Sequence, residues 1–353
     1  MSTTLTAGDD DAWADWAVAV LSTSVSRPAS LRAFEWPGSF ASGSRIVMLD
    51  ESHRPTGSLK HETMRLVFRR LVTDGTIQRG RPVVVASAGN AAVAAAHFCR
   101  MLDLPCTVVV PAATTAAKTE LIRSEHADVV PHSPPAAIYD VAQRISEHAG
   151  GFYLDHFTHA PTAATDSDWP LAHDLTEAVR TLAGTPPTVV VAGLGSGATT
   201  TGLHRHRQHH DRGYRIVGVD AENSAYLPGW LANIPGYGTG MPSRIEGLGR
   251  PVLPASFDPD SIDVIVRSPD AASIAGARHL RTLLNKPVGA SSGANLWVAI
   301  RGARRATQPE TIATFVADAH PHYLDTCHND RWCDKKKLDP QALAHYFRWR
   351  DDG

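Results

Sequence analysis

The sequence has few cysteines and no strong excess of charge of either sign. Its 353 residues include only 4 cysteines, too few for a disulfide framework in a chain of this length. The 34 Lys and Arg residues are nearly balanced by 36 Asp and Glu residues, which gives a formal net charge of −2. Because nucleic-acid binding requires clustered basic residues, this balance argues against nucleic acid as a main partner.

The sequence also lacks a long apolar run. No stretch approaches the roughly 20 apolar residues that are needed to span a bilayer. The acidic N-terminal stretch, residues 1–16, does not contain the apolar core of a signal peptide. We therefore expect a cytoplasmic globular protein without a membrane partner.

Two stretches contain residue types that bind metals. Cys327, His328 and Cys333 match no standard zinc spacing. His206 and His210, in "HRHRQHH", lie one helical turn apart and could share a metal, but a solvated helix face is the preferred interpretation. We therefore predict no metal site.

Strand and helix signals alternate from residue 45 onward. The apolar segments read as strands are "RIVML", "PVVVAS", "CTVVVP", "TVVVAG", "RIVGVD", "DVIVRS" and "TIATFVAD". Apolar residues at helical spacing occupy 64–71, 138–145 and 175–182. This alternation predicts βαβ units and an α/β fold with parallel sheets.

Turn-forming residues predict some boundaries and loops. Ser58 is expected to cap the helix that contains residues 64–71, and Gly75 to end it. The Pro- and Gly-rich region 227–254 predicts a long functional loop, and the segment after Lys335 predicts a terminal helix.

The stretch "TVVVAGLGSGATTTG" combines a strand, a glycine-rich turn and a helix start. Glycines let backbone N–H groups approach an anion, and a helix N-terminus adds positive potential, so the stretch predicts a phosphate cradle. It is not a Walker A loop, and a dinucleotide fingerprint starting at Gly193 would need glycine in place of Ala198. A nucleotide-dependent oxidoreductase and a purely structural turn remain open on this motif alone.

Three further turns occur at strand-to-helix or turn-to-helix boundaries. They contain Lys60 in "PTGSLKHETM", Asn90 in "SAGN" and Ser291 in "GASSGAN". Ligands of open α/β sheets bind at the carboxyl ends of strands. The alternative is that Asn90 and the serines only cap helices and that Lys60 lies on an exposed helix face.

The order of these four motifs resembles the cysteine synthase family of pyridoxal-phosphate enzymes, the fold-type II group that includes tryptophan synthase β-subunits. The resemblance covers about residues 45–305. "DESHRPTGSLKH", "ENSAYLPGW" and "SRIEGLGRP" are most similar to the cysteine desulfhydrase branch. The resemblance implies that each chain forms two three-layer α/β domains, with the cofactor in the cleft between them. It also implies that two identical chains form a homodimer. Residues 50–160 would form a smaller mobile domain with the substrate loop, and residues 1–49 and 161–353 a larger cofactor-binding domain.

The resemblance also implies residue roles. Lys60 would hold pyridoxal 5'-phosphate as a Schiff base and, once displaced by substrate, remove the Cα proton. Asn90 would bind the ring hydroxyl and Ser291 the pyridine nitrogen. The residues expected to bind the phosphate are Gly195, Ser196, Gly197 and Thr199. A neutral serine leaves the ring a weaker electron sink than an aspartate would, which favours β-elimination.

The implied activity is β-elimination on a cysteine-like, β-substituted amino acid through an aminoacrylate intermediate, as in a cysteine desulfhydrase or another carbon–sulfur lyase. Two alternatives share the same residues. One is a β-replacement synthase that makes cysteine or a cysteine analogue, and the other is a catalytically impaired, cofactor-binding pseudoenzyme.

The substrate site departs from the family pattern. The family loop Thr-Ser-Gly-Asn-Thr is here replaced by residues 87–91, with Ala88 and Ala91 in place of hydroxyl residues, and His156 stands where the family has glutamine. Asp318-Ala319-His320 replaces Asp-Ser-Gly, and Glu246 is expected near the active site or at a dimer contact. The predicted substrate-binding residues are Ser87, Ala88, Gly89, Asn90 and His156. We expect either a retuned site for a substrate other than free cysteine, such as a cysteine conjugate, or neutral drift with backbone amides still holding the carboxylate.

Overall fold

The computed structural model contains two compact units. It describes residues 7–23, 29–165, 169–210 and 213–348. The smaller unit comprises Met1–Val25 and Lys60–Ala163, and the larger unit comprises Ser26–Leu59 and Ala164–Gly353. This division differs from the expected one, because residues 50–59 belong to the larger unit and the first 25 residues to the smaller.

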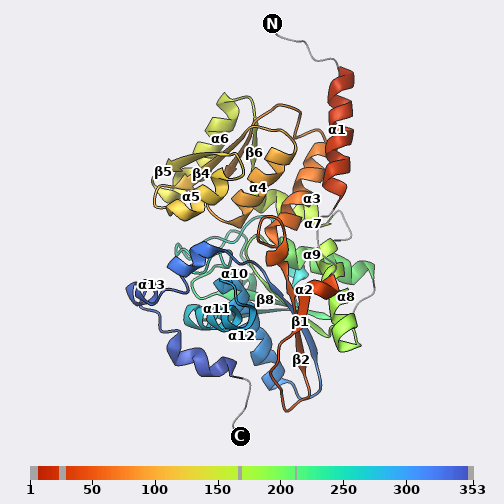
Figure 1. Ribbon diagram of the computed structural model, residues 1–353, viewed down its shortest axis with the longest axis vertical. Coiled ribbons are helices and arrows are strands. Elements are labelled where there is room, and N and C mark those ends of the chain that lie inside the picture. The colour runs from red at the N-terminus through yellow and green to blue at the C-terminus, as the bar shows by residue number, and fades with distance from the viewer. Residues whose placement is uncertain (1–6, 24–28, 166–168, 211–212, 349–353) are drawn as a thin grey trace. The chain divides into compact units, whose positions relative to one another are not determined.

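The smaller unit is built on a parallel four-stranded sheet in the order β5-β4-β3-β6 (Figure 1). Its strands are β3 (Val83–Ala86), β4 (Cys106–Pro111), β5 (Asp128–His132) and β6 (Phe152–Leu154). Its helices are α1 (Ala7–Ser22), α3 (Lys60–Thr73), α4 (Asn90–Met101), α5 (Ala116–Arg123), η2 (Pro135–Ala137), α6 (Ile138–His148) and α7 (His156–Thr165), the last of which crosses into the larger unit. The valines of β3 are fully buried, as expected for a parallel strand covered on both faces.

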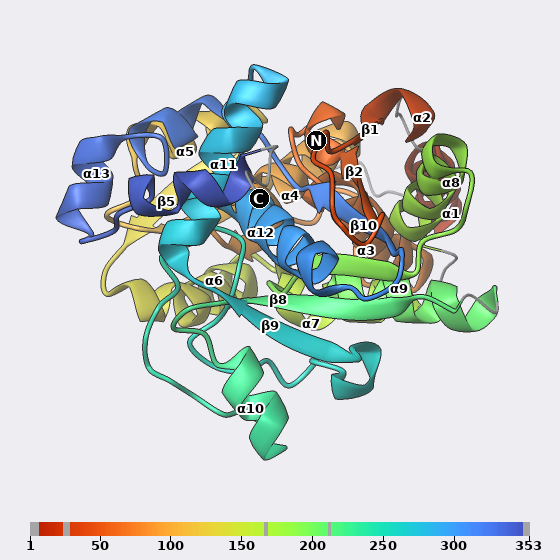
Figure 2. The ribbon, with the colours of Figure 1, turned by 90° about the horizontal axis from the view of Figure 1, so that it is seen from below.

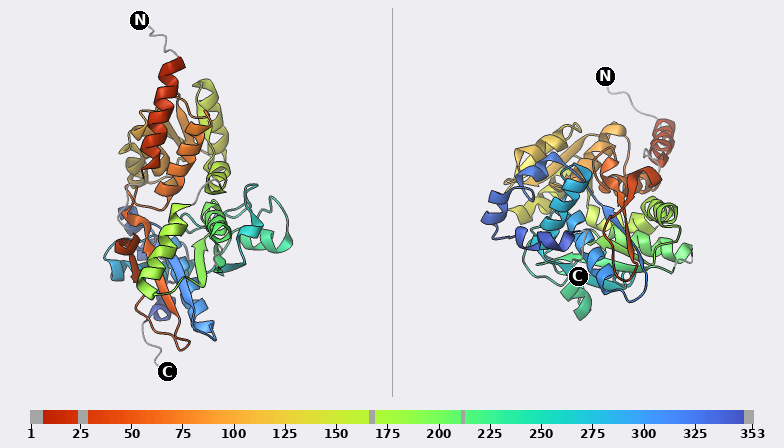
Figure 3. Two further views of the ribbon diagram at one scale, coloured as in Figure 1. Left: turned by 90° about the vertical axis from the view of Figure 1, so that its right-hand side faces the viewer. Right: turned by 60° about the horizontal axis from the view of Figure 1, so that its bottom comes forward.

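Helix α1 belongs to the smaller unit because it packs along α3, visible as the red and orange helices of Figure 3. The buried Arg65 guanidinium of α3 donates to the carbonyl oxygen of Leu21 and also pairs with Glu62. This contact satisfies a carbonyl at the end of α1 that has no intrahelical partner.

The larger unit contains a six-stranded sheet in the order β1-β2-β10-β7-β8-β9, in which only β1 runs antiparallel to its neighbour. Its strands are β1 (Ala33–Glu35), β2 (Arg45–Asp50), β7 (Val189–Gly193), β8 (Arg215–Ala221), β9 (Val264–Ser268) and β10 (Thr311–Val316). Its helices are α2 (Ala29–Arg32), η1 (Glu51–His53), α8 (Pro170–Ala183), α9 (Ala198–His209), α10 (Tyr226–Ala232), η3 (Pro259–Ser261), α11 (Asp270–Leu284), α12 (Ala290–Arg305), η4 (Pro321–Asp325), α13 (Asp330–Lys335) and η5 (Gln341–Phe347).

Helices cover both faces of this larger sheet. The connection from β7 to β8 through α9 and the connection from β9 to β10 through α11 and α12 run in opposite directions along the sheet. Right-handed crossovers in opposite directions place their helices on opposite faces. Figure 2 shows α12 lying along the sheet beside α11.

Glycines let α11 and α12 approach each other at backbone distance. A Cβ at Gly276 would lie 2.5 Å from the carbonyl oxygen of Gly293, and a Cβ at Gly293 would lie 2.0 Å from that of Ser273. Gly293, the glycine of the "SSGAN" motif, is therefore required for helix packing.

Every strand predicted from the sequence is present, and α3 ends before Gly75, which has a φ of +75°. The short strands β1, β5 and β6 were not predicted. The predicted loop 227–254 was wrong in part, because it overlaps α10, and the predicted terminal helix is the 3-10 helix η5.

Two side-chain interpretations were also wrong. Helix α3 begins at Lys60, and the Ser58 hydroxyl is buried and forms no hydrogen bond among the described residues, so Ser58 is not its N-cap.

His206 is not on a solvated face. Its side chain is buried and its Nδ1 lies 3.2 Å from the Tyr214 hydroxyl, because α9 packs this side against the chain that enters β8.

Candidate active site

The segment that follows β10 joins two of the predicted motif regions. On one side, Leu59 donates its backbone N–H to the Ala317 carbonyl at 2.8 Å, and Ala319 donates to the Gly57 carbonyl at 3.3 Å. On the other side, the N–H groups of Gly289 and His320 donate to the carbonyls of Asp318 and Pro287 at 3.2 and 3.0 Å. Residues 317–320 therefore lie between the turn that precedes Lys60 and the loop that precedes Ser291.

This arrangement lies at the carboxyl edge of the larger sheet, where ligands of open α/β sheets bind. β10 pairs with β7, and the glycine-rich turn follows β7 at the same edge. Lys60 follows Leu59 directly and is the first residue of α3, in the smaller unit. The larger unit thus fixes the peptide that leads into the predicted catalytic lysine.

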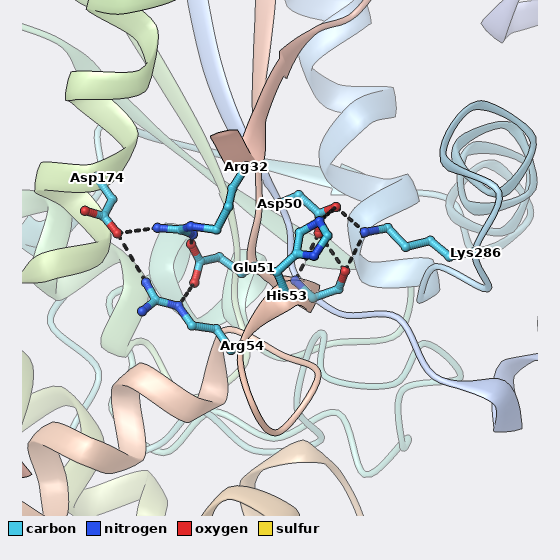
Figure 4. A network of polar contacts seen from close by, with 8 residues as sticks. Arg32, Asp50, Glu51, His53, Arg54, Asp174 and Lys286 are labelled. Carbon is cyan, nitrogen blue, oxygen red and sulfur yellow. Dashed lines mark hydrogen bonds and ion pairs between the residues drawn. The ribbon is translucent and has the colours of Figure 1, made fainter. Parts of the chain in front are cut away.

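A buried ion-pair network anchors the same turn further upstream (Figure 4). Arg32 and Arg54 both bind the carboxylate of Glu51, and all three side chains are buried. The two guanidinium groups also contact Asp174, at 2.5 and 3.2 Å. Because arginine stays protonated when buried, two cations and two carboxylates leave the cluster without net charge.

A second set of contacts fixes the end of β2 beside this network (Figure 4). Asp50 forms an ion pair with Lys286 and accepts a hydrogen bond from the Ser52 hydroxyl at 2.7 Å. Lys286 also donates to the Ser52 hydroxyl at 2.8 Å. The backbone at residues 50–54 is therefore held by side chains from several elements.

The glycine-rich turn has the backbone geometry of an anion-binding loop. Gly197 has a φ of +86°, which favours glycine, and a Cβ at Gly195 would lie 2.6 Å from the Gly247 carbonyl oxygen. Ser196 and Thr199 are buried beside the first turn of α9. The N–H groups of that turn have no intrahelical acceptor and form the positive end of the helix dipole.

Tyr226 supports this loop, and sequence reasoning assigned it no role. Its hydroxyl donates to the Gly195 carbonyl oxygen at 2.7 Å. Burial raises the pKa of Tyr226, so the hydroxyl stays protonated as a donor. Gly249 donates its N–H to the Leu194 carbonyl at 2.6 Å. The loop is therefore held in place by the segments "ENSAYLPGW" and "SRIEGLGRP". Their resemblance to the cysteine desulfhydrase branch was the sequence signal that could have indicated this role.

Ser291 and Asn90 both lie in the first turn of a helix, and neither is the N-cap. The cap positions are Gly289 for α12 and Gly89 for α4. Ser291 is buried, and its neighbour Ser292 accepts the Ala317 N–H at 2.9 Å. The interpretation of these residues as simple caps is therefore wrong.

The predicted substrate loop follows β3 in the smaller unit. Ser87 donates its N–H to the Val109 carbonyl at 3.2 Å, and its hydroxyl accepts the Gly89 N–H at 3.3 Å. Ala88 lies between these two residues, and Asn90 begins α4. The loop thus has a defined turn conformation at the carboxyl end of its strand.

His156 begins α7 in the same unit and is buried, with its ring centroid 3.9 Å from that of Phe157. The preceding Asp155 carboxylate accepts the Phe157 N–H at 3.0 Å and the Thr158 hydroxyl at 2.7 Å. Asp155 therefore fixes the start of the helix on which His156 lies.

A pair of histidines lies against the lysine turn in the larger unit. A Cβ at Gly57 would lie 2.4 Å from Cε1 of His320. His322 stacks on His320 with ring centroids 5.4 Å apart, and its Nε2 lies 3.6 Å from the Glu246 carboxylate. Burial, with the neighbouring His322, lowers the pKa of His320 to about 4. Sequence reasoning noted His320 and Glu246 but did not predict their link through His322.

The residues present fit pyridoxal phosphate. The glycine turn, with its buried hydroxyls and helix N-terminus, suits a phosphate group. Ser291 is a neutral partner of the kind expected for the ring nitrogen, and Lys60 supplies an amine. Across the described ranges, no group of three or more His, Cys, Asp or Glu side chains is arranged to hold a metal ion. Among the same residues, no helix combines the length and the apolar composition of a membrane-spanning segment.

Comparisons with known proteins agree with this fit. The family model described as "Pyridoxal-phosphate dependent enzyme" matches residues 35–318. The L-cysteine desulfhydrase of Mycobacterium tuberculosis is 34% identical over 94% of this chain and 92% of its own length. An N-(2-amino-2-carboxyethyl)-L-glutamate synthase of Ralstonia nicotianae is 26% identical over 80% of this chain and 82% of its own length.

Solved structures show the same fold. A hydrogen sulfide-producing enzyme from Fusobacterium nucleatum matches with a TM-score of 0.72 and 21% identity, over 86% of this chain and 88% of that chain. O-ureido-L-serine synthase matches with a TM-score of 0.73 and 20% identity, over 86% of this chain and 94% of that chain. The predicted α/β fold of the fold-type II group is confirmed.

Proposed function

Because the chain belongs to the family of pyridoxal-phosphate-dependent enzymes, we propose that it catalyses β-elimination on a cysteine-like, β-substituted amino acid, as a carbon–sulfur lyase. The observation that carries this proposal is the match over nearly the whole chain to an L-cysteine desulfhydrase. The retained lysine turn and phosphate loop support it.

We assign the residues as follows. When bound, pyridoxal phosphate supplies an aldehyde that binds amines covalently and a ring that withdraws electrons from the substrate Cα. Lys60 would hold the cofactor through its Nζ, and the same amine would accept the Cα proton of the substrate. Asn90 would bind the ring hydroxyl, and Ser291 would offer the ring nitrogen a neutral partner that does not favour its protonation. The phosphate is bound by Gly195, Ser196, Gly197 and Thr199.

The α-carboxylate of the substrate is assigned to the smaller unit. The residues that bind it are Ser87, Ala88, Gly89, Asn90 and His156. The backbone N–H groups at the start of α4 provide donors that do not depend on the hydroxyls missing at Ala88 and Ala91. The mobile substrate domain, the homodimer and the cytoplasmic location stay predictions.

A β-replacement synthase is the second candidate, and the match to N-(2-amino-2-carboxyethyl)-L-glutamate synthase favours it. Both activities use the same residues up to departure of the β-substituent. A synthase adds a nucleophile at that point, whereas a lyase releases pyruvate and ammonia. Pyruvate formation with and without added thiol or amine nucleophiles therefore separates them.

The test of the proposal uses the cofactor-loaded protein and its Lys60→Ala variant. We expect pyruvate release from β-substituted amino acids, loss of that release in the variant, and a borohydride-reduced adduct that peptide mapping places on Lys60. Lys335→Ala, at an exposed position, is the matched control and should keep full activity. Turnover that survives in Lys60→Ala, or an adduct on another lysine, would contradict the assignment. Lack of turnover by the unsubstituted enzyme would favour the pseudoenzyme alternative.

A further inference from the structure

Three buried side chains around the lysine turn have polar atoms without a hydrogen-bond partner among the described residues. The atoms are Thr56 Oγ1, Ser58 Oγ and His320 Nε2. Their residues are 4%, 0% and 5% exposed. A buried polar atom left unpaired costs about 1–3 kcal/mol, so three in one neighbourhood indicate a polar group that binds there.

Backbone pairing brings these residues together. Ser58 forms a bridge with Asp318, and Gly57 accepts the Ala319 N–H, so residues 56–58 run beside residues 318–320. The His320 ring lies against Gly57. Gly57 is the residue between Thr56 and Ser58 in the sequence. The three side chains therefore come from two adjacent segments and are called the cluster below. The chain reaches Lys60 two residues after Ser58.

The three side chains of the cluster are polar and uncharged, and the buried Asp318 carboxylate, which accepts the Tyr323 hydroxyl at 2.7 Å, lies beside them. The two hydroxyls can donate and accept hydrogen bonds, and a neutral imidazole offers one donor and one acceptor. Burial and the adjacent His322 keep His320 neutral near neutral pH. A thiol or thioether is a weak hydrogen-bond partner, so the sulfur of free cysteine satisfies this cluster poorly. A carbonyl or amide group satisfies it well.

We propose that Thr56, Ser58 and His320 form the subsite for the β-substituent of the substrate and that they select substituents bearing an uncharged carbonyl or amide group over free cysteine. This inference rests on the proposed function, because it concerns the same reaction. A site built to hydrogen-bond a ligand rejects an analogue that lacks the polar group, because its own groups are then left unpaired.

The test compares S-carbamoylmethyl-cysteine with S-isobutyl-cysteine, which have nearly the same shape but differ in the amide. Substrate consumption is followed by chromatography, so that elimination and replacement both register. We expect kcat/KM to be at least about tenfold higher for the amide substrate than for S-isobutyl-cysteine or free cysteine. In His320→Phe this ratio should fall toward one, whereas His320→Gln, with an amide side chain, should retain most of it.

Further variants separate selectivity from folding and cofactor binding. Thr56→Val and Ser58→Ala should each lower the ratio, which gives a second readout if His320→Phe is unstable. His345→Ala, at an exposed position, should leave it unchanged. A ratio near one in the unsubstituted enzyme, an unchanged ratio in all three subsite variants, or a loss of cofactor affinity in place of selectivity would overturn the inference. If neither cysteine nor any conjugate is consumed, the proposed function itself fails.

Discussion

Leu59 donates its backbone N–H to the carbonyl oxygen of Ala317 at 2.8 Å. The N–H of the same Ala317 is bound by the Ser292 hydroxyl at 2.9 Å. Ala317, the residue directly after β10, therefore connects the turn before Lys60 to the first turn of α12. The relative positions of the lysine turn and the Ser291 region depend on this link.

Ser292→Ala should destabilise the protein by about 1 kcal/mol, because it removes the acceptor of the partly buried Ala317 N–H. Urea unfolding monitored by circular dichroism measures the change. Ser291→Ala, one residue earlier in the same helix, is the control. We expect a smaller loss of stability and a shifted visible absorption band of the bound cofactor. Equal destabilisation by the two variants would contradict these separate roles.

Gly195→Ala should lower the affinity for pyridoxal phosphate at least about tenfold, since the new Cβ would lie 2.6 Å from the Gly247 carbonyl oxygen and would displace the loop. Fluorescence titration of the cofactor-free protein with pyridoxal phosphate gives the affinity. At Gly213 a Cβ would meet no atom within 4 Å. Gly213→Ala should therefore bind normally, and an unchanged affinity in Gly195→Ala would show that the loop tolerates the shift.

Two glycine substitutions, one in α11 and one in α12, should change stability in opposite directions. Gly276→Ala places a Cβ 2.5 Å from the Gly293 carbonyl oxygen and should cost about 1–3 kcal/mol of stability. At Gly302 the nearest atom, on Ile312, would be 3.5 Å away, so Gly302→Ala should stabilise α12 by about 0.5–1 kcal/mol. Chemical denaturation of both variants checks the pair, and a destabilised Gly302→Ala would refute the steric argument.

The titration of His320 should make the folded protein less stable in mild acid. The unfolded chain takes up this proton near pH 6.5, whereas the folded chain does so only near pH 4. As the pH falls from about 6.5 to about 4, the unfolded state binds more protons, so the free energy of unfolding decreases by roughly 3 kcal/mol from this residue. His320→Gln should remove this part of the dependence, which denaturation curves across that pH range would show. Parallel curves for both proteins would contradict it.

Local sequence signals were sufficient to predict turns that depend on the backbone of a single residue and strands that depend on apolar periodicity. Gly197 and Gly75 have the positive φ angles that their turns require, and the apolar segments became strands. β1 and β6 have only three residues each, too few to show a period, and the residues of β5 are exposed or only partly buried, without alternation. Their formation depends on pairing with neighbours, which local sequence does not encode.

The candidate site was predictable to the extent that it resembles known motifs. Tyr226 and the segment 317–320 act through partners that are distant in the chain, so their roles emerge only from the fold. Serine is a common N-cap residue, but the backbone of Ser58 pairs with Asp318 instead. That pairing determines which residues surround the Ser58 side chain. His206 is polar in a basic stretch, yet the packing of α9 buries it.

The buried cluster of Arg32, Glu51 and Arg54 has a practical consequence for redesign. It holds the chain as far as Arg54, and the segment that follows β10 holds it again from Gly57 to Leu59. Only Pro55 and Thr56 lie between these two anchors. Libraries aimed at new substrates should therefore keep the ion-pair cluster constant and randomise Thr56 and His320. Such changes would alter the groups offered to an incoming molecule while the lysine keeps its approach to the cofactor.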